Sequence, residues 1–200
     1  MKNPITARNV AGPDGSARPA KPARPVTEAY LERAALHYLE RYSASVAMLR
    51  ATLLRRVQTR CRLRDEDPAP FAPIVEAVVA RAVKVGLVDD ARFTAARAAT
   101  LRRRGTSARG LAAKLAAKGV PRELVEATLA NEQETEEETG DAEAAAARAY
   151  AKRRRIGPWR RPEIRSAHRD RDLAALARAG FPYALARRVI EAEPEDALGQ

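Results

Sequence analysis

The chain has 200 residues with 37 Lys and Arg against 26 Asp and Glu, and its formal net charge is +11. Only 4% of the residues are aromatic, and alanine is abundant, which indicates thin contacts between helices rather than one thick core. No run of about 18 apolar residues occurs, so no membrane span is expected.

Residues 1–26 form a basic tail rich in proline. This composition cannot bury enough apolar surface to offset the entropy of ordering, so we expect the tail to be disordered. The tail also lacks the apolar stretch of a secretory signal, which favours a cytoplasmic location. The single cysteine, Cys61, fits a reducing compartment, and we interpret it as an incidental residue rather than a nucleophile.

The pattern of helix caps and apolar residues over 27–87 predicts a first module of three helices. Thr27 and Ser45 are suitable N-caps, because their hydroxyls can accept bonds from the free N–H groups at a helix start. The helix that follows Ser45 is expected to end at about Val57. Apolar spacing from Ile74 onward predicts the third helix.

Residues 88–131 repeat this order as a second module. Asp89 or Asp90 caps its first helix, Ser107 begins the second, and Pro121 fits the first turn of the third, where a missing N–H costs nothing. The adjacent carboxylates Asp89 and Asp90 could suggest a metal site, but at a helix start we interpret them as caps.

The segment 132–140 is acidic and ends at a glycine. One interpretation is a solvated extension of the preceding helix followed by a hinge; the other is a decoy that occupies the basic surface when no partner is bound. A third module over 141–193 and an acidic tail over 194–200 complete the chain. Between Arg148 and Arg188, 13 basic residues stand against three acidic ones, a balance of +10.

Self-similarity supports the modular division. At an offset of 62 residues the matched pairs are Leu31 and Phe93, Leu39 and Leu101, Arg41 and Arg103, Ser45 and Ser107, Leu49 and Leu111, and Leu53 and Leu115. At an offset of 61, the segment 117–121 matches 178–182. The sequence therefore predicts an all-α protein built as an elongated tandem array of three three-helix modules.

Basic side chains cluster at two predicted helix ends. A basic helical surface suits an anionic partner, because each neutralised phosphate releases counterions. The first cluster is weaker support, since a helix C-terminus attracts cations without any ligand. Trp159 beside the second cluster could stack on a base, although we favour a place in the core. The candidate contact residues are Arg102, Arg103, Arg104, Lys152, Arg153, Arg154, Arg155, Arg160, Arg161 and Arg169.

Catalysis finds little support in the sequence. His37 and His168 lie in unrelated segments without the cysteine or carboxylate spacing of a metal site. Neither a Walker phosphate loop nor a dinucleotide-binding glycine pattern is present. We therefore predict a protein that is not an enzyme and needs neither cofactor nor metal.

The order of these motifs resembles the RecX family of bacterial regulatory proteins, which modulate the RecA recombinase. The resemblance rests on GLVDDARF from Gly86 to Phe93, the Arg-rich turn before Gly105, the spacing of Ser107, Leu111 and Leu115, and Lys118-Gly119-Val120. The flanking modules contribute Ser45, Leu49 and Leu53 on one side and Ala179-Gly180-Phe181 on the other. It covers about residues 28–192.

The resemblance implies a monomeric crescent that lies in the groove of a RecA filament on single-stranded DNA. Bridging neighbouring protomers there would restrain the filament and inhibit its recombinase, ATPase and coprotease activities. The chain departs from the family pattern in its basic tail, its Pro-rich loop over 64–73 and its acidic segment.

Two other classes stay open from the residues alone. Three-helix units with a basic last helix can enter a major groove, as an independent DNA-binding protein would. A nuclease is the second alternative, and the missing set of metal ligands speaks against it.

Overall fold

The computed structural model describes residues 24–139 and 141–193, with side chains omitted over 133–139. The described part contains nine α-helices, two short 3₁₀ turns and no strand, so the predicted all-α class is confirmed. Residues 1–23 of the predicted disordered tail and the whole acidic tail 194–200 lie outside the described residues.

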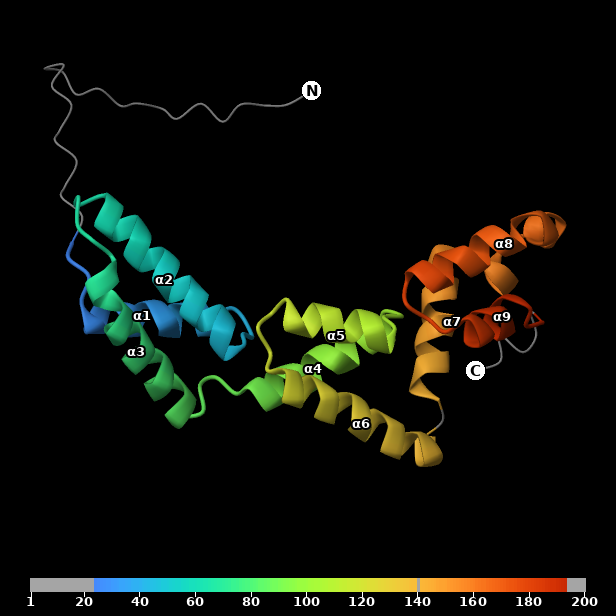
Figure 1. Ribbon diagram of the computed structural model, residues 1–200, viewed down its shortest axis with the longest axis horizontal. Helices are drawn as coiled ribbons and strands as arrows, with labels where there is room; N and C mark the ends of the chain where they lie inside the picture. The colour runs from blue at the N-terminus through green and yellow to red at the C-terminus, as the bar shows by residue number, and fades with distance from the viewer. Residues whose placement is uncertain (1–23, 140, 194–200) are drawn as a thin grey trace, which may run out of the picture.

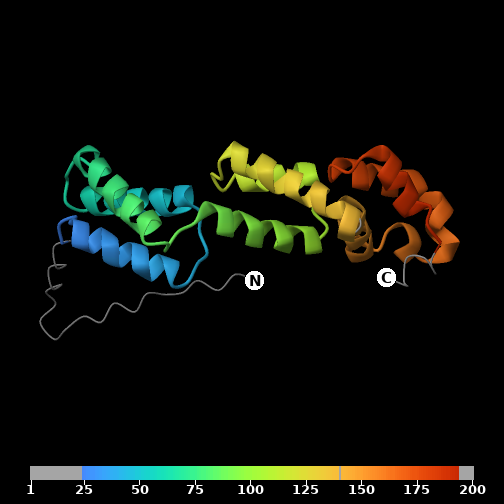
Figure 2. The same cartoon turned by 90° about the horizontal axis from the view of Figure 1, so that it is seen from below.

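The helices follow one another in three groups that form an arc (Figure 1). Module 1 contains α1 (Glu28–Leu39), α2 (Val46–Arg62), the turn η1 (Ala69–Phe71) and α3 (Ala72–Lys84); module 2 contains α4 (Asp90–Arg103), α5 (Ala108–Ala116) and α6 (Arg122–Thr139); module 3 contains α7 (Ala142–Arg154), the turn η2 (Gly157–Trp159), α8 (Pro162–Arg178) and α9 (Tyr183–Ile190). The second helices, α2, α5 and α8, lie on the side toward which the arc opens. Seen from below in Figure 2, the three groups lie in a row along the long axis.

Each module has its own apolar core. Fully buried leucines, such as Leu49 in module 1 and Leu111 in module 2, fill the first two cores. Module 3 instead packs α7 through alanines, among them Ala147 and Ala151, against α8 and α9. Because alanine has no side chain beyond Cβ, α7 approaches its neighbours closely, as the alanine-rich composition predicted.

Helix α2 is longer than the sequence predicts, whereas α6 extends through the acidic segment as one of the two interpretations predicts. Helix α2 continues past Val57 to Arg62, because Val57 and Cys61 lie one turn apart and both are buried. Helix α6 continues through the acidic segment as far as Thr139. Gly140 lies outside the described residues, so the hinge and the decoy stay predictions.

Modules 1 and 2 are joined through the buried N-cap of α2. The Oγ of Ser45 accepts a bond from the Met48 N–H (3.1 Å) and donates to the Lys118 carbonyl just beyond α5 (2.5 Å). The Val46 N–H donates to Oδ1 of Asp90 at the start of α4 (2.9 Å). The start of α2 thus donates one hydrogen bond to the end of α5 and another to the start of α4.

Modules 2 and 3 are joined in the same way. The Oγ of Ser107, the N-cap of α5, accepts from the Gly110 N–H (3.1 Å) and donates to the Ala179 carbonyl after α8 (2.6 Å). The Ala108 N–H donates to Oε2 of Glu143 in the first turn of α7 (2.9 Å). The repeat seen in the sequence is therefore a repeat of the joint between modules.

A glycine makes the close approach possible at both joints. Gly119 and Gly180, equivalent at the 61-residue offset, have φ of +71° and +94°. A Cβ at Gly119 would collide with the Cβ of Ala47, and one at Gly180 would lie 2.7 Å from the Ser107 Oγ. Both the left-handed backbone and the lack of space require glycine there.

Replacing Ser107 with alanine tests the joint. The Ser107→Ala change removes the cap of α5 and leaves the Ala179 carbonyl without its donor, so we expect the free energy of unfolding to fall by about 1–3 kcal/mol. Urea denaturation followed by circular dichroism measures it. Ser166→Ala, at an exposed position of α8, serves as the control and should change stability by less than about 0.5 kcal/mol. Equal effects would contradict the joint.

Candidate anion-binding groove

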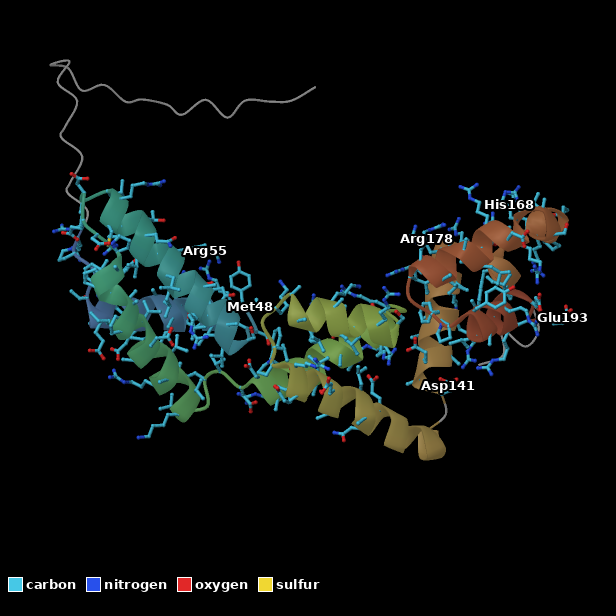
Figure 3. All side chains as sticks on the ribbon, viewed as in Figure 1. Met48, Arg55, Asp141, His168, Arg178 and Glu193 are labelled. Carbon is cyan, nitrogen blue, oxygen red and sulfur yellow. The ribbon has the colours of Figure 1, made fainter. Side chains whose placement is uncertain are left out.

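A basic groove lies between modules 2 and 3. Its volume is about 990 Å³, and α4, α5, α7 and α8 contribute its walls. Its cationic lining residues are Arg97, Arg104, Lys114, Arg153, Arg154, Arg160, Arg171 and Arg178. Asp172 is the one carboxylate among the lining residues. In Figure 3, Arg178 lies on α8 toward the inside of the arc.

The joint between the modules creates this groove. Because the Ser107 hydroxyl holds the end of α8 against the start of α5, Gly110 and Ala179 both line the groove. The last turns of α4 and α7 bring Arg104 and Arg154 to it. A helix C-terminus attracts cations even without a ligand. Here, however, the C-termini of α4 and α7 both place arginines in the same groove.

The one carboxylate of the groove is already neutralised. Asp172 is 2% exposed and accepts bonds from the Gly157 N–H (3.0 Å) and from Nε and Nη2 of Arg160 (3.0 and 2.7 Å). The side-chain hydrogen bond with Asp172 raises the pKa of Arg160. This pair fixes the turn η2 and leaves no free negative charge to balance the other cations.

Most of the remaining cations are exposed and lack acidic partners. Arg104, Arg171 and Arg178 form no ion pair with any residue that the structure describes. The guanidinium carbons of Arg153 and Arg154 lie 5.9 and 5.5 Å from the Tyr150 ring centroid, which is a modest cation–π attraction. Like charges gathered without acids repel one another, so an anion in the groove would relieve that repulsion.

Comparisons with known proteins agree with the modular structure. The family described as "RecX, second three-helix domain" matches residues 89–129, which span α4, α5 and the first part of α6. Regulatory protein RecX of Myxococcus xanthus is 42% identical over 186 residues, covering 92% of this chain and 96% of that protein. The chain belongs to the RecX family.

Two further relatives are also named Regulatory protein RecX. The protein of Agrobacterium fabrum is 30% identical over 184 residues, covering 92% of this chain and 94% of its own length. That of Thermobifida fusca is 33% identical over 158 residues, with coverages of 77% and 80%. No solved structure matches the chain. The predicted resemblance to RecX is therefore confirmed.

The predicted contact residues of this RecX-family chain fall into three groups. Arg104, Arg153, Arg154 and Arg160 line the groove; Arg103, Lys152, Arg155 and Arg161 are exposed outside it; Arg102 and Arg169 form ion pairs within the molecule. The sequence did not single out Arg97, Lys114, Arg171 and Arg178, because each stands apart from the basic runs. Arg171 and Arg178, seven residues apart on α8, share a helix face, and this periodicity was the available signal.

Arg102 is a clamp inside the RecX fold rather than a free surface cation. Its side chain is 13% exposed, and its Nε and Nη2 donate to Oε2 of Glu132 (3.0 and 2.6 Å). Its Nη1 donates to Glu143 and to the Thr106 carbonyl (3.1 Å). Burial lowers the pKa of Arg102, but the hydrogen bonds to both carboxylates outweigh it and the pKa is raised. A contact with a partner would require these ion pairs to break.

Two other predictions concern single side chains. Trp159 is half-buried and packs against the core of module 3, as the core interpretation predicted. Asp89 caps α4 by accepting bonds from the N–H groups of Ala91 (2.8 Å) and Arg92 (3.0 Å), and these bonds lower its pKa. The capping interpretation of Asp89 is confirmed.

Neither a metal-binding cluster nor a membrane-spanning helix occurs in the described ranges. These residues contain no group of three or more His, Cys, Asp or Glu side chains that could hold a metal ion. Of the helices over 24–139 and 141–193, none is both long and apolar enough to cross a bilayer.

Removing the clamp tests its role. Arg102→Ala leaves Glu132 and Glu143 facing each other without their shared cation, so we expect a loss of about 3 kcal/mol. This loss is at the lower end of the range for breaking a buried ion pair, because the side chains of Arg102, Glu132 and Glu143 are still 13%, 21% and 19% exposed. Arg103→Ala, one residue away and exposed, is the control and should cost under about 0.5 kcal/mol. Chemical denaturation measures both, and an Arg102 variant as stable as the control would refute the clamp.

Proposed function

We propose that this chain is a non-enzymatic regulator that binds the RecA recombinase filament on single-stranded DNA. By binding, it inhibits the recombinase, ATPase and coprotease activities of the filament. The observation that carries the proposal is the 42% identity to a Regulatory protein RecX across 92% of the chain. It acts as a monomer in the cytoplasm and requires no cofactor.

The arc supports this function physically. A filament is a long, curved partner with regularly spaced protomers, and modules joined in series follow such a surface better than one compact domain. The second helices, α2, α5 and α8, line the inner side of the arc and face a partner bound there (Figure 1). Contacts from two or three modules to neighbouring protomers then resist the rearrangements that filament growth and strand exchange need.

The groove between modules 2 and 3 supplies the anion contacts of this proposal. Arg104, Arg153 and Arg154 are exposed in it, and guanidinium groups bind phosphates and carboxylates through paired hydrogen bonds. The buried pairs of Arg102 and Arg160 position the groove walls. Exposed and buried arginines thus have different roles in one site.

The direct test uses the recombinase of the same organism. The purified protein should co-sediment with that filament on single-stranded DNA and lower its DNA-dependent ATPase activity. Failure in both assays would overturn the proposed function, since each depends on the same binding.

A matched pair of variants locates the working surface. Arg104→Ala/Arg153→Ala/Arg154→Ala removes three exposed cations of the groove, and Arg103→Ala/Lys152→Ala/Arg161→Ala removes three exposed cations outside it. We expect the groove variant to inhibit the ATPase at least tenfold more weakly, which corresponds to about 1.4 kcal/mol of lost binding. The other variant should stay within about twofold of the parent. Thermal melts confirm folding, and equal losses would show that total charge, not the groove, determines inhibition.

An independent DNA-binding protein remains the second candidate, because the groove cations are available to nucleic acid without any recombinase. Such a protein would show sequence preference on duplex DNA in the absence of RecA. The regulator instead predicts sequence-tolerant binding that weakens steeply with salt.

A further inference from the structure

Module 1 carries a second arginine-rich surface, far along the chain from the groove. Two adjoining depressions of about 390 and 380 Å³ lie beside α1 and α2, and both are lined by Tyr30 and Arg60. Their cationic residues are Arg24, Arg33, Arg55, Arg56 and Arg60. Three threonines, Thr27, Thr52 and Thr59, also line them, and no carboxylate does. We call these residues the module 1 arginine surface.

The centre of this surface is ordered by a stacking contact. The guanidinium carbon of Arg60 lies 3.7 Å from the Tyr30 ring centroid, which fixes this cation between the two depressions. Beside it, Arg55 donates through Nη2 to the Thr52 hydroxyl (3.2 Å) and through Nε to the Ala51 carbonyl (3.3 Å). These neutral partners orient the guanidinium groups and leave their charge uncompensated.

Acidic partners are present in module 1 but are engaged elsewhere. Arg50 pairs with Glu76, and Arg81 pairs with Glu28 and Glu32. Among the residues that the structure describes, none of the five arginines of the module 1 arginine surface forms an ion pair with a carboxylate. A merely solubilising face would mix both signs, so the segregation of charge favours an anionic ligand.

The position of this surface on α2 is a second, independent observation. At the 62-residue offset, the end of α5 at Ala116 corresponds to Leu54, yet α2 continues to Arg62. The extra turns bury Val57 and Cys61, while Arg55 and Thr59 are exposed. Helix α5 has no counterpart of this segment. Three of the five arginines of the module 1 arginine surface, Arg55, Arg56 and Arg60, therefore lie on the part of α2 that has no equivalent in α5.

We infer that the module 1 arginine surface binds the phosphodiester backbone of a single-stranded nucleic acid. Guanidinium forks and hydroxyl donors match the several acceptor oxygens of a phosphate. Two small hollows that meet at a flat Tyr30–Arg60 stack suit successive phosphates of one strand, and the exposed Leu63 at the edge offers an apolar contact to a sugar or base. This binding does not require the recombinase proposed above.

One arginine of the surface and one of the groove lie on the inner side of the arc. Figure 3 shows Arg55 on α2 and Arg178 on α8 on the side toward which the arc opens. A strand of sufficient length therefore contacts both places at once. Simultaneous contact raises affinity beyond that of either place, because the second contact becomes intramolecular.

The test measures binding of a fluorescein-labelled oligothymidylate by anisotropy at several salt concentrations, with the full chain and no recombinase. Arg55→Ala/Arg56→Ala/Arg60→Ala should weaken binding at least tenfold at low salt. It should also reduce the slope of log K against log salt by about 0.7 for each lost phosphate contact, or roughly 2 for all three. An unchanged slope would overturn the inference.

The matched control is Arg41→Ala/Arg62→Ala/Lys84→Ala. These three exposed residues belong to module 1, line neither depression and carry the same total charge. The control variant should keep the parental slope of log K against log salt. Equal effects of the two triple variants would show that only the total charge matters and would contradict the inference. If circular dichroism shows that the first triple is unfolded, the exposed single change Arg55→Glu is compared with Arg62→Glu by the same criterion.

A competitor decides the class of partner. Unlabelled oligothymidylate should displace the labelled strand from the parent at far lower charge concentration than poly-L-glutamate does. Displacement by both at equal charge concentration would assign the surface to an acidic protein and overturn a nucleic-acid site.

Discussion

The hydroxyl of a buried N-cap serine holds each module to the next. At Ser45 and again at Ser107, one oxygen accepts a bond from its own helix and donates to a carbonyl that ends the second helix of the following module. A neighbouring carboxylate, Asp90 or Glu143, accepts the first N–H of the same helix. The bonds are directional and shielded from water, so they fix the orientation of the modules and hence the arc.

The groove depends on this joint because none of its walls is complete within one module. Arg104 and Lys114 come from module 2, whereas Arg153, Arg171 and Arg178 come from module 3. Gathering these cations is unfavourable, and the buried Arg102 clamp beside the joint offsets that repulsion by tying α4, α6 and α7 together. Arg102 and Arg160 are thus engaged within the fold, whereas Arg104, Arg171 and Arg178 form no ion pair with any described residue.

Local chemistry explains which features the sequence could predict. Ser45, Ser107 and Asp89 each act on N–H groups within three residues, so their capping roles follow from the sequence alone. The engagement of Arg102 depends on Glu132 and Glu143, 30 and 41 residues away, and its place in a basic run pointed to the surface instead. The groove brings Arg97 and Lys114 of module 2 to Arg171 and Arg178 of module 3 only after the joint forms. The spacing of Arg171 and Arg178 indicates a shared helix face, but no local pattern predicts the groove.

The third module differs from the first two at the very atoms that make the joint. Helix α8 begins after Arg161, which makes no side-chain cap, and its first residue is Pro162. The hydroxyl donor of Ser45 and Ser107 is therefore missing there, and the first N–H, which Val46 and Ala108 direct to a carboxylate, does not exist in proline. Pro162 is favourable for starting a helix, yet it prevents α8 from receiving another module in the same way. A further module therefore cannot be joined to the start of α8 through the same pair of hydrogen bonds.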